Sequence, residues 1–356
     1  MASPAARPTA VEFRRVTKRY GDVVAVNQVS FTIEQGTLVT LLGPSGCGKT
    51  TTLRLIAGLE LASEGEVLIG GRDVTRRPAT DRNVSMVFQS YALFPHMSVL
   101  DNVAYGPTVS GASRARAHEQ AREKLALVGL KGLDARLPSE LSGGQQQRVA
   151  VARALVLEPE VLCFDEPLSN LDAKLRRRVR EDIRELQQRL GLTVAYVTHD
   201  QQEALAVSDR IIVMDHAAIA QSGTPRELYE APVSLFVADF VGDSNLVDAE
   251  LTSRNGVAGQ IRVGGVELRL PHRGAGLGPV KVAVRPESLR LSDAPPPGPA
   301  LEGRIAKAAY LGTHMEYTVS TAVGELFVVD REVTRPAPAG TPVWVSFEDH
   351  GVTVVP

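Results

Sequence analysis

Cysteine is scarce in this sequence of 356 residues, which contains only Cys47 and Cys163. Both lie inside apolar or glycine-rich segments, so the sequence gives no support for a disulfide framework and fits a reducing compartment. No stretch approaches the roughly 18 consecutive apolar residues of a transmembrane helix. The first ten residues also lack the basic and apolar regions of a secretory signal. We therefore expect a soluble chain that reaches a membrane only through a partner.

An excess of charge of either sign is missing too. The sequence has 39 Lys and Arg against 41 Asp and Glu, a net charge of −2, and only 5% aromatic residues. This balance gives no global electrostatic argument for binding nucleic acid or anionic lipid. The length exceeds that of one ordinary compact domain, so two domains are expected.

Short apolar runs alternate with helical patterns across residues 1–240. This alternation predicts a mostly parallel sheet with helices on its faces, an α/β domain. The expected strands are Leu38–Leu42, Val161–Phe164, Thr193–Thr198 and Ile211–Met214, and the expected helices are Gly48–Ala57, Leu171–Leu190 and Gln201–Ala206.

An inserted helical subdomain is expected at about 90–158. Ser113 is placed to cap a helix whose Ala117, Ala121, Leu125 and Val128 recur at helical spacing.

The pattern changes again at 241–356, where short alternating segments are separated by Gly and Pro and no long helix is evident. An all-β barrel or sandwich is expected there. Its candidate strands are Val263–Leu270, Val280–Val284, Tyr317–Ser320, Glu325–Val329 and Val343–Phe347.

The segment Gly43–Thr50, with the sequence Gly-Pro-Ser-Gly-Cys-Gly-Lys-Thr, fits the phosphate-loop pattern between an expected strand and an expected helix. Its glycines allow backbone N–H groups to converge on phosphate oxygens at a helix N-terminus. Lys49 is then placed for the β- and γ-phosphates and the Thr50 hydroxyl for Mg²⁺. A merely glycine-rich turn is the weaker interpretation.

Two adjacent carboxylates, Asp165 and Glu166, end the apolar run Val161–Phe164. Beside a phosphate loop, Asp165 is predicted to hold Mg²⁺, directly or through water, and Glu166 to act as the general base for an attacking water. Without the phosphate loop, a solvated pair would be an equal alternative.

The segment Leu141–Gln145, Leu-Ser-Gly-Gly-Gln, opens another expected helix. Ser142 is a plausible N-cap, and the two glycines that follow it expose N–H groups at the positive end of the helix dipole. From spacing alone, an ordinary capped helix is the preferred interpretation.

The same segment, however, resembles the signature of ABC transporter ATPases, and the resemblance extends over the whole chain. Tyr20 resembles the aromatic residue that stacks on adenine, and Gln89 the Q-loop glutamine that contacts Mg²⁺ and relays movement to membrane subunits. Asp172 lies in a segment like the D-loop, and His199 resembles the switch histidine at the γ-phosphate.

This resemblance implies a P-loop NTPase that binds ATP and Mg²⁺, with Glu166, His199 and Gln89 as catalytic residues and Thr50, Gln89 and Asp165 as metal ligands. The residues expected at the nucleotide are Tyr20, Gly43, Pro44, Ser45, Gly46, Cys47, Gly48, Lys49, Thr50, Thr51, Ser142, Gly143, Gly144, Gln145 and Asp172.

It also implies partners. Because a phosphate loop leaves the γ-phosphate open on one side, the 142–145 turn of a second copy is expected to close it in a head-to-tail dimer. Two transmembrane permease subunits and, indirectly, an extracytoplasmic binding protein are expected, with this chain peripheral on the cytoplasmic face of the inner (plasma) membrane.

The C-terminal part resembles the OB-type regulatory barrels of importer ATPases of the maltose, polyamine and ferric-iron group, through Val284–Glu287 and Tyr310–Gly312. Residues 241–356 hold 11 Lys and Arg against 13 Asp and Glu, so the basic, aromatic groove of a nucleic-acid-binding OB fold is not expected.

The basic run Lys174–Arg180 is followed by acids that form i,i+4 pairs such as Arg177–Glu181 and Arg178–Asp182, as on a solvated helix face.

Ferric iron is the expected substrate, with polyamine, phosphonate, sulfate and sugar as alternatives. Two other classes stay open: a soluble ABC ATPase outside transport, and a regulatory protein that binds ATP without hydrolysis.

Overall fold

The computed structural model describes residues 7–355, and the chain divides into two compact units between Pro225 and Arg226. The division falls before the expected domain border at 240/241. The reason is that the two short helices α7 (Pro225–Glu230) and α8 (Leu235–Phe240) bury side chains in the second unit, where α8 packs on strands β11 and β14. The prediction on the first ten residues lies mostly outside the described residues.

A six-stranded sheet forms the centre of the first unit, in the order β10-β9-β3-β8-β7-β6. Strands β9, β3, β8, β7 and β6 run parallel, and β10 pairs antiparallel at one edge. The expected parallel sheet is therefore confirmed. Its strands are β3 (Leu38–Leu42), β6 (Val84–Val87), β7 (Val161–Asp165), β8 (Val194–Thr198), β9 (Arg210–Asp215) and β10 (Ala218–Gly223).

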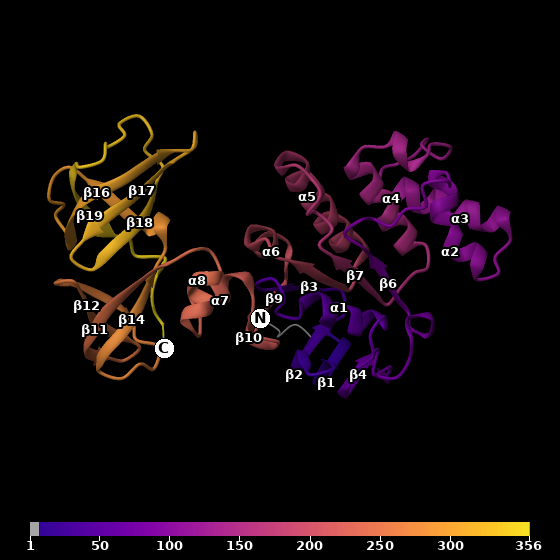
Figure 1. Cartoon of the computed structure of the whole chain (residues 1–356), viewed down its shortest axis with the longest axis horizontal. Coiled ribbons are helices and arrows are strands. Elements are labelled where there is room, and N and C mark those ends of the chain that lie inside the picture. Colours follow the sequence, from indigo (N-terminus) through magenta and orange to yellow (C-terminus); the bar gives the residue numbers. More distant parts are fainter. Residues whose placement is uncertain (1–6, 356) are drawn as a thin grey trace, which may run out of the picture. The chain divides into compact units, whose positions relative to one another are not determined.

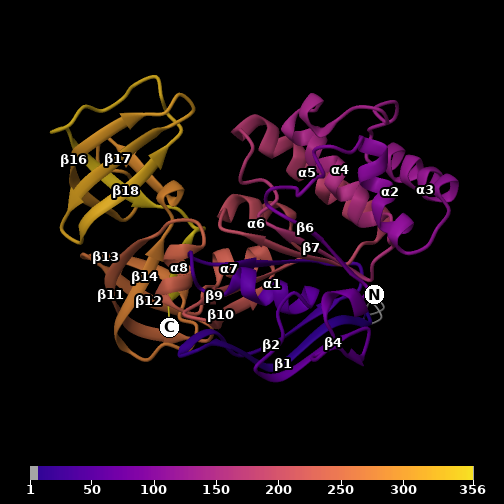
Figure 2. The ribbon, with the colours of Figure 1, turned by 45° about the vertical axis from the view of Figure 1, so that its right-hand side comes forward.

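A second, antiparallel sheet of this unit was not expected from the sequence. It has the order β2-β1-β4-β5 and lies near helix α1, as both views of the ribbon show (Figures 1 and 2). Its strands are β1 (Thr9–Tyr20), β2 (Val23–Glu34), β4 (Glu64–Ile69) and β5 (Arg72–Asp73).

Helices cover both faces of the central sheet, and the expected helical insert is present between β6 and β7 (Figure 1). Ser113 caps the second inserted helix as predicted, because its side chain accepts a hydrogen bond from the backbone N–H of Arg116. The helices are α1 (Lys49–Ala57), α2 (Val99–Val109), α3 (Arg114–Leu127), α4 (Gly143–Leu155), α5 (Ala173–Leu190) and α6 (Gln201–Val207).

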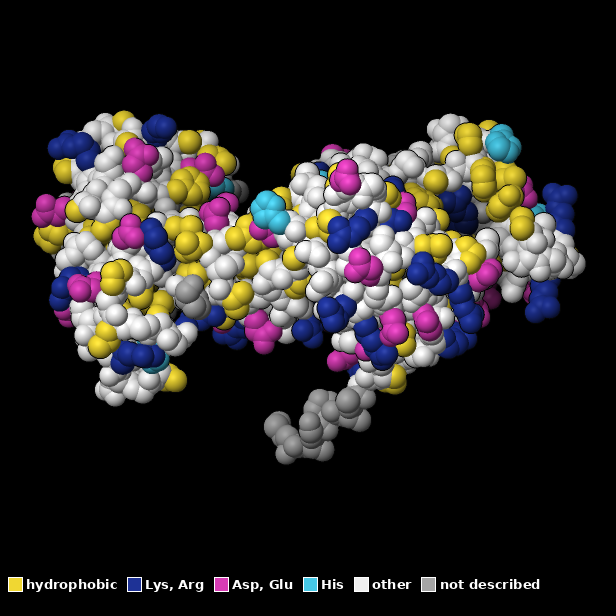
Figure 3. Space-filling model, turned by 60° about the horizontal axis from the view of Figure 1, so that its bottom comes forward, with side chains coloured by type: hydrophobic (Ala, Val, Ile, Leu, Met, Phe, Trp, Pro, Cys, Tyr) yellow, Lys and Arg dark blue, Asp and Glu magenta, His cyan; other side chains and the backbone are white. Residues whose placement is uncertain are grey.

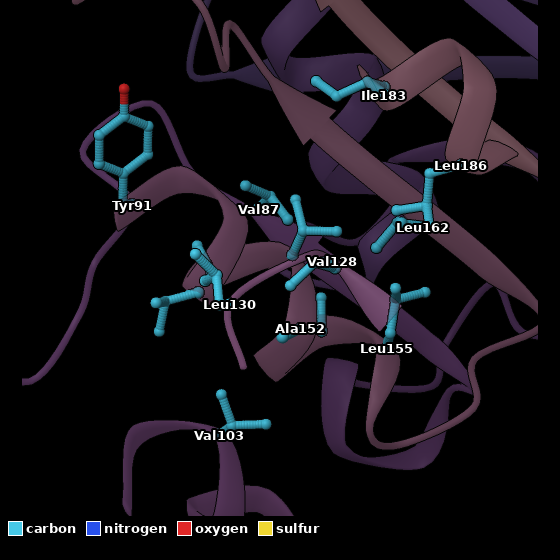
Figure 4. Close-up of a cluster of buried hydrophobic side chains, with 14 of the residues drawn as sticks. Val87, Tyr91, Val103, Val128, Leu130, Ala152, Leu155, Leu162, Ile183 and Leu186 are labelled. Atoms are coloured by element: carbon cyan, nitrogen blue, oxygen red, sulfur yellow. The ribbon is translucent and has the colours of Figure 1, made fainter. Parts of the chain in front are cut away.

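The apolar side chains of the central strands alternate between two cores. In β7, Leu162 and Phe164 join the core formed with α2–α5, while Val161 and Cys163 join the core formed with α1 and the antiparallel sheet. Figure 4 shows part of the first core, including Leu162, Ala152 and Leu155. Burial on both faces explains why these strands appear in the sequence as continuous apolar runs.

Beyond α7 and α8, the second unit forms two five-stranded antiparallel sheets with the orders β13-β12-β11-β14-β20 and β15-β19-β16-β17-β18, which confirms the all-β fold expected after residue 240. Its strands are β11 (Asn245–Asn255), β12 (Ala258–Val263), β13 (Val266–Pro271), β14 (Gly278–Val284), β15 (Leu289–Ser292), β16 (Ala300–Tyr310), β17 (Met315–Thr321), β18 (Gly324–Asp330), β19 (Pro342–Phe347) and β20 (Val352–Val355).

The prediction of one strand over Val263–Leu270 was wrong. Gly264 and Gly265 both have positive φ, 53° and 92°, and form the two-residue turn between β12 and β13. A Gly-Gly pair between apolar runs is a recognised hairpin signal.

No helix within residues 7–355 is long and apolar enough to cross a membrane. On the face drawn in Figure 3, basic and acidic side chains lie interspersed, in line with the small net charge.

Candidate functional site

Four segments with chemically active side chains meet at the carboxyl edge of the central sheet. The strands β3, β8, β7 and β6 are consecutive parallel neighbours. Each is followed directly by a predicted site segment, which begins at Gly43, His199, Glu166 and Phe88 respectively. In open α/β sheets, this edge is where ligands bind. Sequence positions more than a hundred residues apart are thereby brought together.

The loop Gly43–Gly48 joins β3 to α1 in a conformation that requires glycine at two points. Gly48, the N-cap of α1, has φ 102°, and a Cβ atom there would lie 2.3 Å from the carbonyl oxygen of Ala25. At Gly43 a Cβ atom would lie 2.3 Å from the carbonyl oxygen of Met214. Close backbone contacts leave no room for a side chain at either position, which keeps the loop tight around the start of α1.

Lys49 folds back over this loop. Its side chain is buried, and Nζ donates to the carbonyl oxygens of Gly43 at 2.7 Å and Pro44 at 2.8 Å. Burial raises the pKa of the neighbouring Cys47 thiol, so Cys47 packs as an apolar residue inside the loop. The lysine thus holds the loop closed and carries a positive charge beside the backbone amides.

Thr50 and Asp165 bring two oxygens together at the sheet edge. The Thr50 hydroxyl donates to Oδ1 of Asp165 at 3.3 Å. Burial raises the pKa of Asp165, while the Thr50 hydrogen bond lowers it. A half-buried carboxylate beside a hydroxyl is the hard oxygen donor set that Mg²⁺ prefers, with phosphates and water completing its shell. These residues fit a magnesium ion bound together with a nucleotide.

Glu166 lies against His199, the first residue after β8. Oε2 of Glu166 is 3.2 Å from Nδ1 of His199. The backbone of Glu166 has φ 45°, a left-handed conformation, and its N–H donates to the carbonyl oxygen of Val197 at 3.0 Å. Strained backbone of this kind is found preferentially at functional sites. The arrangement places a carboxylate and an imidazole side by side at the sheet edge.

Gln89 follows β6 and is exposed at the same edge. Its backbone carbonyl oxygen accepts a hydrogen bond from the side-chain amide of Asn170, at 3.0 Å. Asn170 belongs to the segment Ser169–Asp172, and the Ser169 hydroxyl in turn donates to the carbonyl oxygen of Glu166 at 3.0 Å. The Gln89 segment and the Glu166 segment are therefore linked by side-chain hydrogen bonds. This role of Asn170 has no signal in the sequence.

The turn Ser142–Gln145 lies at the N-terminus of α4, where a Cβ atom at Gly143 would lie 3.1 Å from Leu171 of the segment Ser169–Asp172. Ser142 caps α4 as predicted, because its side chain accepts from the Gln145 N–H. The Ser142 N–H in turn donates to Oε1 of Gln145 at 3.0 Å, which completes a capping box. A Cβ atom at Gly144 would lie 3.0 Å from Leu175 of α5. Among the described residues, no hydrogen bond joins this turn to the phosphate loop.

Asp172 has a structural role within the chain, because its side chain caps α5 by accepting from the Leu175 N–H at 2.9 Å.

Tyr20 lies at the end of β1 and is 44% exposed, with Nζ of Lys18 4.7 Å from the ring centroid. An exposed ring face of this kind is available to stack on a planar ligand.

A buried carboxylate behind His199 was missed in the sequence. Glu203 is 4% exposed and accepts hydrogen bonds from the Tyr196 and Thr198 hydroxyls, the latter at 2.7 Å. The Thr198 hydroxyl also accepts from the N–H of Asp200 at 3.0 Å. Burial raises the pKa of Glu203. This network fixes the backbone on both sides of His199, and no periodic pattern in the sequence indicates it.

The expected ion pair between Arg178 and Asp182 is not formed, and Asp182 instead lies 3.3 Å from Arg148 of α4. The other expected pair, Arg177 with Glu181, is present at 3.3 Å. The difference arises because α5 packs on α4, so Asp182 faces a helix and not solvent.

Comparison with known proteins agrees with this geometry. A family model described as "ABC transporter" matches residues 26–169, and a second, described as "TOBE domain", matches residues 282–355. The chain is 60% identical over 349 residues to the Fe(3+) ions import ATP-binding protein FbpC of Rhizobium etli, covering 98% of both chains. It is 47% identical to the protein of the same description in Escherichia coli, covering 97% of both.

Solved structures are similar over a shorter length. One is a dimeric, post-hydrolysis ATP-binding cassette bound to ADP and Pi, with 32% identity and a TM-score of 0.54, covering 61% of this chain and 99% of that one. Another is cbiO1 of Clostridium perfringens, part of an ABC transporter complex, with 26% identity and a TM-score of 0.59, covering 63% of this chain and 92% of that one.

Proposed function

This chain belongs to the family of ABC transporter ATP-binding proteins, and from that premise we propose that it is the ATP-hydrolysing subunit of an importer for ferric iron. The observation that carries the hydrolytic part is the convergence of Thr50, Asp165, Glu166 and His199 at one sheet edge. The 60% identity to an Fe(3+) ions import ATP-binding protein over nearly the whole chain supports the choice of substrate.

In the proposed reaction, the backbone N–H groups of Gly46 to Lys49 and the Lys49 ammonium hold the phosphates of ATP. Thr50, Asp165 and Gln89 would hold Mg²⁺, and the ion would neutralise charge at the phosphates when bound. Glu166 orients a water and accepts its proton as the water oxygen bonds to the γ-phosphorus, and the bond to the β,γ-bridging oxygen breaks. The imidazole of His199, beside Glu166, is placed to donate to the γ-phosphate.

Two copies would complete the site. The Ser142–Gln145 turn forms the N-terminus of α4 and contains two glycines, and Ser142 is exposed. Because no contact described within the chain joins this turn to the phosphate loop, we infer that it serves the loop of a second copy, in a head-to-tail dimer. The dimer would attach peripherally to two permease subunits at the cytoplasmic face of the inner membrane, with a binding protein on the other side.

The experiment is reconstitution of the chain with its permease subunits in liposomes, with ATP inside and a loaded extracytoplasmic binding protein outside. We expect phosphate release to rise when the binding protein carries Fe(3+), and not when binding proteins carry a polyamine, sulfate or a sugar. If one of these binding proteins stimulated phosphate release and the Fe(3+)-loaded one did not, ferric iron would not be the substrate.

The regulatory class and the shared site are tested separately. If the chain bound ATP but released no phosphate with Mg²⁺ and permease present, it would be a regulatory protein. If the Glu166→Gln protein with Mg²⁺ and ATP stayed monomeric even with the permease, the proposal that two copies share one ATP site would be wrong.

A further inference from the structure

A small cavity lies where α4 and α5 pack together beside the end of α3. Its volume is 210 Å³. Apolar side chains form most of its walls, and Figure 4 labels three that belong to it, Val128, Ile183 and Leu186. It lies within the first unit, away from the phosphate loop, and none of the groups assigned to ATP hydrolysis lines it.

Polar atoms without partners are concentrated in this cavity. Seven buried side-chain nitrogen or oxygen atoms of the described residues have no hydrogen-bond partner, and four of them line it. They are both amide atoms of Gln147, Nε of Arg148 and Oδ2 of Asp182. Oδ2 of Asp182 still lies 3.3 Å from Nη2 of Arg148 in an ion pair, so the Gln147 amide is the one group here without any partner. Such groups are rare in folded proteins because each costs the free energy of its lost hydration. A fully unpaired amide in a cavity wall indicates that a polar group binds there.

The side chain of Gln147 is the strongest evidence for a bound polar group. This side chain is 0% exposed, yet neither Nε2 nor Oε1 is paired. A leucine would fill a similar space without that cost. An amide presents one donor edge and one acceptor edge side by side, so its best partner carries the complementary pair.

Charge and size define the ligand further. The cavity is lined by two basic residues, Arg148 and Arg189, and two acidic residues, Asp182 and Glu185, so it has no net preference for an ion. Its volume lies below the roughly 300–1,000 Å³ of pockets for drug-sized ligands. One ring fits these limits, and a nucleotide does not.

We propose that this cavity binds a small neutral heterocycle with N–H and C=O groups side by side, and that Gln147 recognises that edge. Uracil and 2-pyridone have this edge on a single ring. The proposal does not depend on the function proposed above, because the binding can be measured without ATP.

The test is titration of the full-length, nucleotide-free protein with uracil and with 2-pyridone, followed by calorimetry and ligand-observed NMR. We expect saturable binding of at least one of them, weakened at least about tenfold by Gln147→Leu. The variant Val151→Phe, which fills the cavity, should abolish binding. Gln146→Leu is the matched control, because the Gln146 amide donates to Pro138 and Leu141 outside the cavity.

A second comparison uses wild-type protein only and so does not depend on any variant folding. 1,3-Dimethyluracil keeps the ring but has no N–H group, so it should not bind. If it or toluene bound as well as uracil did, the cavity would be merely apolar and the proposal wrong. If neither uracil nor 2-pyridone bound and a high-resolution crystal structure showed only water on Gln147, the proposal would also be overturned.

Discussion

Oε2 of Glu166 and Nδ1 of His199 lie 3.2 Å apart, although the two residues follow different strands. Strands β7 and β8 are parallel neighbours, so the first residue after each occupies the same edge. A carboxylate within reach of an imidazole has a defined orientation before any ligand arrives. This is the preorganisation that general-base catalysis requires.

Replacement of Glu166 by glutamine is the first prediction. The amide keeps the shape of the side chain but cannot accept a proton, so phosphate release should fall about 10²–10⁴-fold. ATP binding should persist, because Lys49 and the loop amides are unchanged. The measurements are steady-state phosphate release and nucleotide binding, and size-exclusion chromatography with ATP should show the dimer accumulating.

Glu181→Gln is the matched control for this change, since Glu181 is exposed and forms an ion pair with Arg177 on α5. It should leave turnover unaltered. Near-normal phosphate release by the Glu166→Gln protein would exclude Glu166 as the base.

The phosphate loop gives a second prediction through two glycines. Gly48→Ala places a Cβ atom 2.3 Å from the Ala25 carbonyl oxygen at φ 102°, whereas Gly46→Ala meets no atom within 4 Å, although φ is 80°. We expect about 2–5 kcal/mol of destabilisation for Gly48→Ala and about 1–2 kcal/mol for Gly46→Ala. Chemical denaturation followed by circular dichroism measures both, and equal losses would contradict the close contact at Gly48.

Arg285 gives a third prediction. Its buried guanidinium lies within hydrogen-bonding distance of the carbonyl oxygens of Tyr229, Ala238 and Gly242, and 4.1 Å from the Tyr229 ring. Arg285→Ala would remove these hydrogen bonds and the contact with the ring, so we expect the second unit to lose about 3 kcal/mol or more. Trp344, the only tryptophan in the chain, lies in β19 and reports on this unit alone by fluorescence.

The control is Arg290→Ala, which removes an exposed pair with Glu348 and should cost about 0–1 kcal/mol. A similar small effect of Arg285→Ala would show that the α7–α8 segment is not held by this side chain.

The fourth prediction concerns pH and Glu203. Burial raises its pKa in the folded protein above the ordinary value of 4.5. The folded state therefore binds this proton more tightly than the unfolded state does. The stabilisation that results is fully present below pH 4.5 and is lost as pH rises through the folded pKa.

Glu203→Gln removes this titration and keeps a polar side chain behind His199. As pH increases from about 5 to about 8, the variant should become more stable relative to the wild type. The measurement is the free energy of unfolding of both proteins in urea. A difference that did not change with pH would show that Glu203 ionises normally.

The sequence was sufficient for the parts of the fold that have a local signal. Leu38–Leu42 and Val194–Thr198 are buried on both faces and therefore appear as unbroken apolar runs. The helices around Ser113 and Ser142 have N-caps that can be recognised from residue type and spacing. The hairpin at Gly264-Gly265 was missed because the apolar pattern continues through both strands.

What could not be predicted depends on contacts distant in sequence. The Asn170–Gln89 hydrogen bond, the Glu203 network and the Arg148–Asp182 pair exist only once β6, β7, β8, α4 and α5 are packed. Likewise, the division at Pro225 follows from the attachment of α7 and α8 to Arg285, which has no periodic signature. Motif residues can be read in order along the chain, but their mutual distances cannot.

The hydrogen bond from Asn170 to Gln89 has a thermodynamic consequence. Asn170 belongs to the segment Ser169–Asp172, whose Leu171 lies next to Gly143 of the turn proposed to serve a second copy. Gln89 belongs to the segment expected to relay movement to a membrane subunit. Two binding events that both bias one shared contact must affect each other's affinity by the same factor. Docking of a permease and pairing of the two copies would then be reciprocal, so a change that one event makes in the affinity of the other must appear, by the same factor, in the reverse measurement.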